Sequence, residues 1–319
     1  MGMMDRDLLR KKLEGCYITV PTMFRDPDLE VDTAAIQRHV AFLRKRGINA
    51  DNGVLLAGGA AGDFSTMSFD ERALVAETVV EAAAGQVPVA MGAQTTSTRE
   101  LKQLAKTAQR LGCDFIQVSC PFYFTHTEDD FYEYVAAAAE AADIGIIVYN
   151  TFWTSSGISI AMAERLCAIP NVVGLKWATP RTDAMEFEDT VSHFARRLTI
   201  IDNNLLFTMS HMMGARAFEV HLCNYWPEWG IKLLDRLSAR DYAEVQRMMV
   251  DEAMPFYKLW VEIEKTYTSG DGYLDKLCVE LVGLDSSRCR PPTRDVRGKF
   301  REKCRQMMIE SGVPGVIKK

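Results

Sequence analysis

Apolar runs and amphipathic segments alternate eight times along this chain, and this alternation constrains the fold more than any other feature. The runs are short enough to be buried strands and span residues 15–24, 53–57, 87–93, 115–122, 144–150, 172–177, 198–203 and 217–224. Segments with helical spacing lie between them, among them residues 32–46, 68–84, 97–111, 128–142 and 159–168. Eight strands that each lead into a helix predict an α/β protein with a (β/α)8 TIM barrel, a fold of roughly 250 residues.

The chain is longer than such a barrel requires, and its remaining part also has helical spacing. Two helices of the barrel begin with a capping-box pattern, at Ser68 with Glu71 and at Ser97 with Glu100. After the eighth run, further helices are predicted over residues 226–237, 239–265, 272–282 and 294–311. We therefore expect a barrel that carries the active site over residues 1–225. A C-terminal helical extension over residues 226–319 should pack on it.

Composition excludes several classes of partner. The 319 residues carry a formal net charge of −6, with 48% hydrophobic and 25% charged residues, as is ordinary for soluble enzymes. Nucleic acid is not an expected partner, because phosphate binding needs a basic surface. No apolar run approaches the ~20 residues that span a bilayer, and residues 1–12 lack the apolar core of a signal peptide. The eight cysteines form no CxxC pair, which favours reduced thiols in a cytoplasmic protein.

Lys176 is an unexpected residue in the sixth run, which otherwise predicts a buried strand. Burying an unpaired ammonium group costs several kcal/mol or lowers its pKa. The ordinary pKa of lysine is about 10.4, and burial can bring it to about 7–8, where the neutral amine attacks a carbonyl and forms a Schiff base. The alternative is a lysine at a strand end whose long stem reaches solvent.

The fifth run ends in Tyr149 and Asn150, one strand before Lys176. Because the carboxyl ends of parallel strands meet at one face, we expect Tyr149 and Lys176 to emerge side by side. A phenol beside an amine-derived imine can pass protons to and from it. The alternative is a tyrosine that ends a strand with its hydroxyl in water.

With these residues in place, the chain resembles the pyruvate-dependent class I aldolase superfamily that includes dihydrodipicolinate synthase and N-acetylneuraminate lyase. The resemblance covers nearly the whole chain, and its motifs are Gly59-Ala60-Ala61-Gly62-Asp63, Pro121-Phe122-Tyr123, Tyr149-Asn150 and Gly174-Leu175-Lys176. It implies that Lys176 forms an imine with the keto carbon of a 2-oxo acid and that Tyr149 shuttles protons. A Schiff-base aldolase needs no metal, and we expect no cofactor.

The same resemblance implies roles for two loops. The glycine-rich turn with Gly59, Ala60 and Ala61 would grip the substrate carboxylate through backbone amides, as anion-binding turns do. The alternative is a turn that is merely flexible. Tyr123 would enter the active site of a neighbouring subunit across a dimer contact. We therefore expect a homo-oligomer, a dimer or a tetramer.

Two departures from the family pattern bear on the substrate. Ala60 and Ala61 stand where family members usually carry threonines, so the hydroxyl that commonly relays protons between two tyrosines is absent. Dihydrodipicolinate synthases place an arginine shortly after the Tyr-Asn pair to bind a second carboxylate, and residues 151–157 contain none. Ser155 in this loop is a candidate substrate-binding residue. A role in lysine biosynthesis is therefore not expected.

Aromatic residues gather at or just beyond the predicted carboxyl ends of the strands, where substrate-contacting loops of a barrel begin. They are Phe64, Phe122, Phe124, Phe152, Trp153, Trp177, Tyr225 and Trp226. Any single one is more often a packing residue than a ligand contact. Together they favour an acceptor aldehyde with an apolar or aromatic part over a polyhydroxylated sugar chain.

Glu219 and His221 stand two apart in the eighth run, so as strand residues they would share a face. If that face lines the barrel mouth, Glu219 is a candidate to bind a substrate hydroxyl or to act as an acid or base. Glutamate and histidine also ligate divalent ions. No HxH, HxxxH or clustered-carboxylate motif accompanies them, so we expect no metal.

The leading hypothesis is a lyase that acts on a 2-oxo acid through an imine at Lys176, by aldol cleavage or by condensation of pyruvate with an aldehyde. A hydratase-aldolase with an apolar or aromatic aldehyde is one form of it. An alternative is a dehydratase or aldolase of 2-keto-3-deoxy sugar acids in the same family. A non-catalytic binding or regulatory barrel is another, suggested by the absent threonines.

Overall fold

The computed structural model describes residues 5–154, 157–178 and 184–317, and it contains the predicted barrel. Eight strands follow one another around a closed sheet in chain order, β1 to β8. Their bounds are β1 Gly15–Val20, β2 Gly53–Ala57, β3 Val89–Gly92, β4 Phe115–Ser119, β5 Gly145–Thr151, β6 Val172–Ala178, β7 Thr199–Asp202 and β8 Ala217–Glu219. Every residue of these strands is buried, which explains why the runs are mostly apolar.

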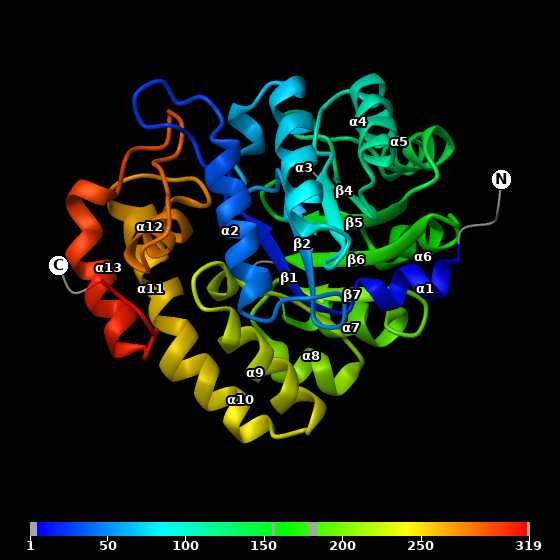
Figure 1. Cartoon of the computed structure of the whole chain (residues 1–319). Helices are drawn as coiled ribbons and strands as arrows, with labels where there is room; N and C mark the ends of the chain where they lie inside the picture. The colour runs from blue at the N-terminus through cyan, green and yellow to red at the C-terminus, as the bar shows by residue number, and fades with distance from the viewer. Residues whose placement is uncertain (1–4, 155–156, 179–183, 318–319) are drawn as a thin grey trace. The chain divides into compact units, whose positions relative to one another are not determined.

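Helices alternate with the strands along the chain (Figure 1). Those up to β8 are α1 Arg6–Lys12, α2 Thr33–Lys45, α3 Phe69–Ala83, α4 Thr98–Leu111, α5 Glu128–Ala141, α6 Ile160–Cys167, α7 Ala184–Phe194 and α8 Phe207–Met213. After β8 come α9 Pro227–Ser238, α10 Tyr242–Met248, α11 Met254–Thr266, α12 Tyr273–Leu281 and α13 Arg297–Glu310. The predicted fold class is thus confirmed. None of the helices within the described ranges is long and apolar enough to cross a bilayer.

The chain divides into two compact units, and each is described by itself. The first comprises Met1–Tyr17, Ala50–Leu55 and Val87–Glu219, and the second comprises Ile18–Asn49, Leu56–Gln86 and Val220–Lys319. In the first unit α4 packs on α5, and α5 on α6. In the second unit α2 packs on α3, and α12 on α13. The boundary between residues 225 and 226 stays a prediction.

Two predicted elements differ from the structure. The eighth run is a strand only as far as Glu219, and His221–Asn224 forms the 3₁₀ helix η2. The single helix predicted over residues 239–265 is divided by a π-helical segment, η3 Met249–Ala253, between α10 and α11. Pro255 explains this division, because proline has no N–H for the carbonyl four residues earlier and its ring crowds that carbonyl.

The N-cap serines of α3 and α4 differ in the hydrogen bonds that they form. The capping box at Ser68 and Glu71 is present at the start of α3. At α4 only half of the predicted box forms. The Ser97 side chain accepts a hydrogen bond from the backbone N–H of Glu100, but the Glu100 carboxylate accepts one from Thr95. The prediction of a complete box there was therefore wrong.

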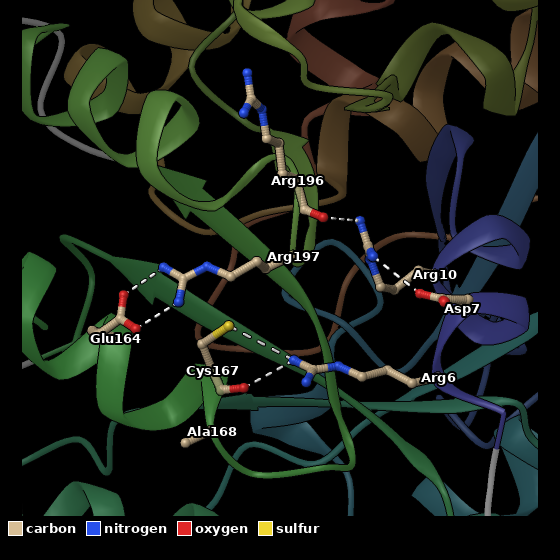
Figure 2. A pocket seen from close by; sticks show the side chains of 8 residues that line it. All are labelled: Arg6, Asp7, Arg10, Glu164, Cys167, Ala168, Arg196 and Arg197. Atoms are coloured by element: carbon tan, nitrogen blue, oxygen red, sulfur yellow. Dashed lines mark hydrogen bonds and ion pairs between the residues drawn. The ribbon is translucent and has the colours of Figure 1, made fainter.

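An arginine-lined pocket of about 350 Å³ lies in the first unit, where α1 contacts β6 (Figure 2). Arg6 donates to the carbonyl oxygens of Cys167, at 2.9 Å, and Val172, at 3.0 Å. It thereby joins the end of α6 to the start of β6. Arg197 pairs with Glu164 on the opposite wall of the pocket. These guanidinium groups connect the elements around the start of β6, the strand that carries Lys176.

Candidate active site

A buried ion pair joins β6 to β8. Lys176 Nζ donates to Glu219 Oε2 at 2.6 Å, and the two side chains are only 5% and 4% exposed. Strand β7 lies between their strands, so the two side chains can meet only by pointing into the barrel. The alternative of a lysine that reaches solvent from the strand end is therefore wrong.

Two tyrosine rings flank the amine of Lys176. Its Nζ lies 4.7 Å from the ring centroid of Tyr149 and 5.0 Å from that of Tyr17, within the range of cation–π attraction. Tyr149 is the register partner of Lys176 on β5, and Tyr17 is the register partner of Glu219 on β1. The strand order thus places Tyr149 beside Lys176, as the sequence predicts, and adds Tyr17 on the other side.

Each of the two phenol groups is held by an amide side chain. Asn203, just after β7, donates to Tyr149 Oη at 3.0 Å, which leaves the phenol proton for another acceptor. Tyr17 Oη donates to Gln117 Oε1 at 3.1 Å. Burial, together with the neighbouring Glu219 and Tyr149, raises the pKa of Tyr17 well above its usual range. The raised pKa favours the neutral phenol of Tyr17, and the hydrogen bond from Asn203 fixes the position of Tyr149 Oη.

A second buried carboxylate ends β7. Asp202 accepts hydrogen bonds from Ser210 Oγ at 2.6 Å and from the backbone N–H of Asn204 at 2.7 Å. Burial raises its pKa to about 6, although these hydrogen bonds act in the opposite direction. Asp202 thus ties the end of β7 to α8 and shapes the loop from which Asn203 reaches Tyr149.

The glycine-rich turn after β2 belongs to the second unit. A Cβ on Gly59 would lie 2.5 Å from a methyl carbon of Leu56, so a side chain at this position would require Leu56 to move. The backbone of Gly272 packs closely against Ala61. A Cβ on Gly272 would lie 2.3 Å from the carbonyl oxygen of Ala61. Asp63, at the end of the turn, pairs with buried Lys276 at 2.6 Å. The turn is therefore a tightly packed structure, which disfavours the alternative of a flexible loop.

His221 does not share a strand face with Glu219, which corrects the sequence prediction. It lies in η2, and its Nδ1 is 3.1 Å from both carboxylate oxygens of Asp275 in the second unit. Among the described residues, donor atoms of His221, Asp271 and Asp275 lie within 4.8 Å of one another, close enough for a metal ion. Hydrogen bonds from His221 and Asn224 already account for the burial of Asp275, so we assign no metal to this cluster.

The aromatic residues at the strand ends differ in burial. Tyr225 is buried, and Phe64 and Trp226 are half-buried. Phe122, Phe124, Phe152 and Trp153 are exposed, on the loops after β4 and β5. Trp177 is fully buried and follows Lys176 in β6, so it points away from the barrel interior and has no pocket role. Tyr123 is 84% exposed and has a φ of 93°, an unusual conformation for a non-glycine residue. Ser155 lies outside the described residues.

Sequence reasoning missed three residues of this cluster: Tyr17, Gln117 and Asn203. Gln117 carried a usable signal, since it is a polar residue within the apolar run of β4, as Lys176 is in β6. Tyr17 gave none, because a tyrosine in a strand is ordinary. Asn203 was included in the seventh run as its last residue, but nothing in the sequence indicates that it reaches back to β5.

Comparisons with known proteins agree with this architecture. The chain matches the model of the Dihydrodipicolinate synthetase family over residues 12–310. It is 28% identical over 306 residues to the 4-hydroxy-tetrahydrodipicolinate synthase of Methanopyrus kandleri, over 95% of this chain and 97% of the relative. An uncharacterized DapA-like lyase of Thermococcus kodakarensis is 24% identical over 307 residues, which cover 93% of this chain and 99% of that protein.

Among solved structures, the dihydrodipicolinate synthase of Acinetobacter baumannii in complex with pyruvate has the same fold. Its TM-score is 0.77 at 23% identity, over 94% of this chain and 99% of that chain. At this identity the likeness extends to the fold alone. The family model, by contrast, covers almost the whole chain and includes both β5 and β6.

Proposed function

The chain belongs to the Dihydrodipicolinate synthetase family of lyases, and from this premise we propose that it forms an imine between Lys176 and the keto carbon of a 2-oxo acid. The observation that carries the proposal is the buried amine of Lys176, held at the end of β6 beside a carboxylate and a phenol. The pyruvate in the A. baumannii structure supports pyruvate as the simplest such acid.

The imine supplies the chemistry of a lyase. A protonated imine withdraws electrons from the adjacent carbon and stabilises the enamine that forms when a neighbouring bond breaks. Tyr149 transfers protons to and from this intermediate. Its oxygen accepts from Asn203, and its ring lies against the amine of Lys176. Both C–C cleavage and loss of water pass through this enamine. No cofactor is required.

Three further parts of the chain have roles in the proposed reaction: the turn after β2, Tyr123 and Ser155. Backbone amides of the turn at Gly59, Ala60 and Ala61 bind the carboxylate of the 2-oxo acid, which the rigid packing of this turn supports. Tyr123 contributes to a neighbouring subunit in a dimer or tetramer, and its exposed, strained conformation supports a contact of this kind. Ser155 remains a candidate contact for the second substrate. We propose that the protein acts in the cytoplasm.

We further propose that the acceptor is an aldehyde with an apolar or aromatic part. Phe152 and Trp153, directly after β5, lie with ring centroids 4.4 Å apart and are exposed. No arginine occurs between Asn150 and Gly157, so this loop offers no guanidinium fork for a second carboxylate. A 2-keto-3-deoxy sugar acid is the second candidate. The retained Lys176 and Tyr149 argue against a barrel without catalysis.

The first experiment traps the imine. Borohydride reduction of the protein with pyruvate, followed by intact-mass measurement, should add one pyruvate-derived group. Lys176→Arg should give no adduct and no turnover, because a guanidinium stays protonated. It also keeps a cation beside Glu219, which preserves the buried pair. An equal adduct in the unmodified and Lys176→Arg proteins would show that the imine forms elsewhere.

The second experiment tests the acceptor. We expect kcat/KM with pyruvate to be higher for an aromatic aldehyde than for aspartate semialdehyde or a polyhydroxy aldehyde. The lost guanidinium contact and the exposed rings of Phe152 and Trp153 are the reasons. A tenfold preference for aspartate semialdehyde, about 1.4 kcal/mol in transition-state binding, would contradict the proposed acceptor.

A further inference from the structure

The contact between Lys176 and Glu219 bears on how the amine of Lys176 loses its proton before it attacks a carbonyl. An ammonium group cannot attack a carbonyl, so the amine must first lose a proton. Glu219 Oε2 lies 2.6 Å from Lys176 Nζ and is the carboxylate oxygen that contacts this amine among the described residues. Its side chain is 4% exposed, so bulk water has little access to the exchange.

Neighbouring groups are less suited to accept that proton. The raised pKa of Tyr17 favours its neutral form, and its phenol proton is donated to Gln117. Tyr149 faces Lys176 Nζ with its ring. Glu219 is therefore the group whose geometry suits proton exchange with the amine.

We infer that Glu219 is both the base and the acid of imine formation at Lys176, a catalytic residue in direct contact with the reacting nitrogen. This inference rests on the proposed function, because it concerns how the imine at Lys176 is made. The sequence predicts that Glu219 binds a substrate hydroxyl or acts as an acid or base, and the contact with Lys176 Nζ favours the second role at a stated atom.

The proton balance closes without an added reagent. Glu219 first takes one proton from the ammonium group, which leaves a neutral amine and a carboxylic acid. The amine adds to the keto carbon as the C–N bond forms, and a proton moves from nitrogen to the former carbonyl oxygen. Glu219 then returns its proton to the departing hydroxyl, which leaves as water. The products are a protonated imine, one water molecule and the original carboxylate, now the counter-ion of the imine.

A purely electrostatic role for Glu219 predicts the opposite effect of a substitution. In Glu219→Gln the buried lysine loses its counter-ion, which favours the neutral amine and hence the nucleophile. A counter-ion role therefore predicts imine formation at least as fast as in the unmodified protein. An acid–base role predicts slower formation, because loss of water from the carbinolamine lacks its proton donor.

The experiment measures the rate of imine formation with pyruvate by rapid mixing, borohydride quench and intact mass. Glu219→Gln should be slower by about 10²- to 10⁴-fold, the usual effect of losing an acid–base group. Glu219→Asp should recover part of the rate. In Glu219→Ala, added formate should restore it in proportion to its concentration. Asp114→Asn is the matched control, since it neutralises another carboxylate of the first unit that pairs with a lysine, Lys12 at 2.9 Å, and it should leave the rate unchanged.

The outcomes separate this inference from the proposed function. Thermal unfolding of each variant shows whether it is folded, and the formate arm compares one folded protein with itself. If the unmodified protein forms the adduct and Glu219→Gln forms it equally fast or faster, Glu219 is only a counter-ion and this inference is wrong. The inference is also wrong if Glu219→Ala is slow and formate has no effect. If the unmodified protein forms no adduct with any 2-oxo acid, the proposed function and this inference both fall.

Discussion

Removing one partner of the Lys176–Glu219 pair leaves the other charge buried without compensation, which costs about 3–5 kcal/mol in comparable cases. Lys176→Met should therefore lower the free energy of unfolding by several kcal/mol, although its side chain fits the same space. Adding Glu219→Gln to this variant should recover at least about 1 kcal/mol, because both charges are then gone. Chemical denaturation of the three proteins at pH 7 measures the difference. Equal losses in the single and double variants would show that the pair is uncoupled.

The residues of the site were predictable to different degrees. Lys176 could be found because an ionisable group interrupts an apolar run, and Tyr149 because successive parallel strands end at one face. That Glu219 touches Lys176 could not be predicted. It depends on which side chains meet across the barrel once β8 closes on β1, and a sequence pattern gives only the face of each strand. Gln117 could have been found by the argument used for Lys176.

Elements of the fold followed from the sequence wherever a local signal was present. The capping box at Ser68 marks the start of α3, because a serine and a glutamate three residues later satisfy each other's backbone N–H groups. The half-formed box at Ser97 shows the limit of this signal, since Thr95 competes for the same glutamate. The end of β8 at Glu219 had no local signal, because residues 220–223 are as apolar as the strand itself apart from His221.

Arg6 should matter for stability at the level of elements. One guanidinium nitrogen of Arg6 donates to the carbonyl of Cys167 at the end of α6 (Figure 2). The same nitrogen donates to the carbonyl of Val172 at the start of β6. Arg6→Ala leaves these acceptors without their charged donor, so we expect a loss of about 1–3 kcal/mol in the free energy of unfolding. Arg196→Ala in the same pocket is the control. Its side chain points away from Glu164 and Cys167 in Figure 2 and should change stability by less than about 0.5 kcal/mol. Equal losses of stability in Arg6→Ala and Arg196→Ala would contradict the proposal that Arg6 stabilises the contact between α6 and β6.

At the scale of the whole molecule, each of the two compact units contains a buried group that titrates with an unusual pKa. In the first unit, burial raises the pKa of Asp202 from 3.8 to about 6. In the second unit, burial lowers the pKa of His39 from 6.5 to about 4, although its hydrogen bond to the carbonyl of Asn224 opposes the shift. A difference of this size between the folded and unfolded pKa of a group corresponds to about 3 kcal/mol of pH-dependent stability.

The two groups act in opposite directions over the same range of pH. Between about pH 4 and 6 the folded protein keeps Asp202 protonated while the unfolded chain ionises it, so this contribution is lost as pH rises. Over about pH 4 to 6.5 the unfolded chain protonates His39 while the folded protein keeps it neutral, so that contribution is lost as pH falls. Asp202→Asn should therefore make stability rise more steeply with pH than in the unmodified protein, and His39→Gln should make it rise less steeply. Chemical denaturation of the three proteins between pH 4 and pH 7 tests this, because all other groups are shared and cancel in the comparison. If the free energy of unfolding changed with pH in the same way in all three proteins, burial of Asp202 and His39 would not shift their pKa values.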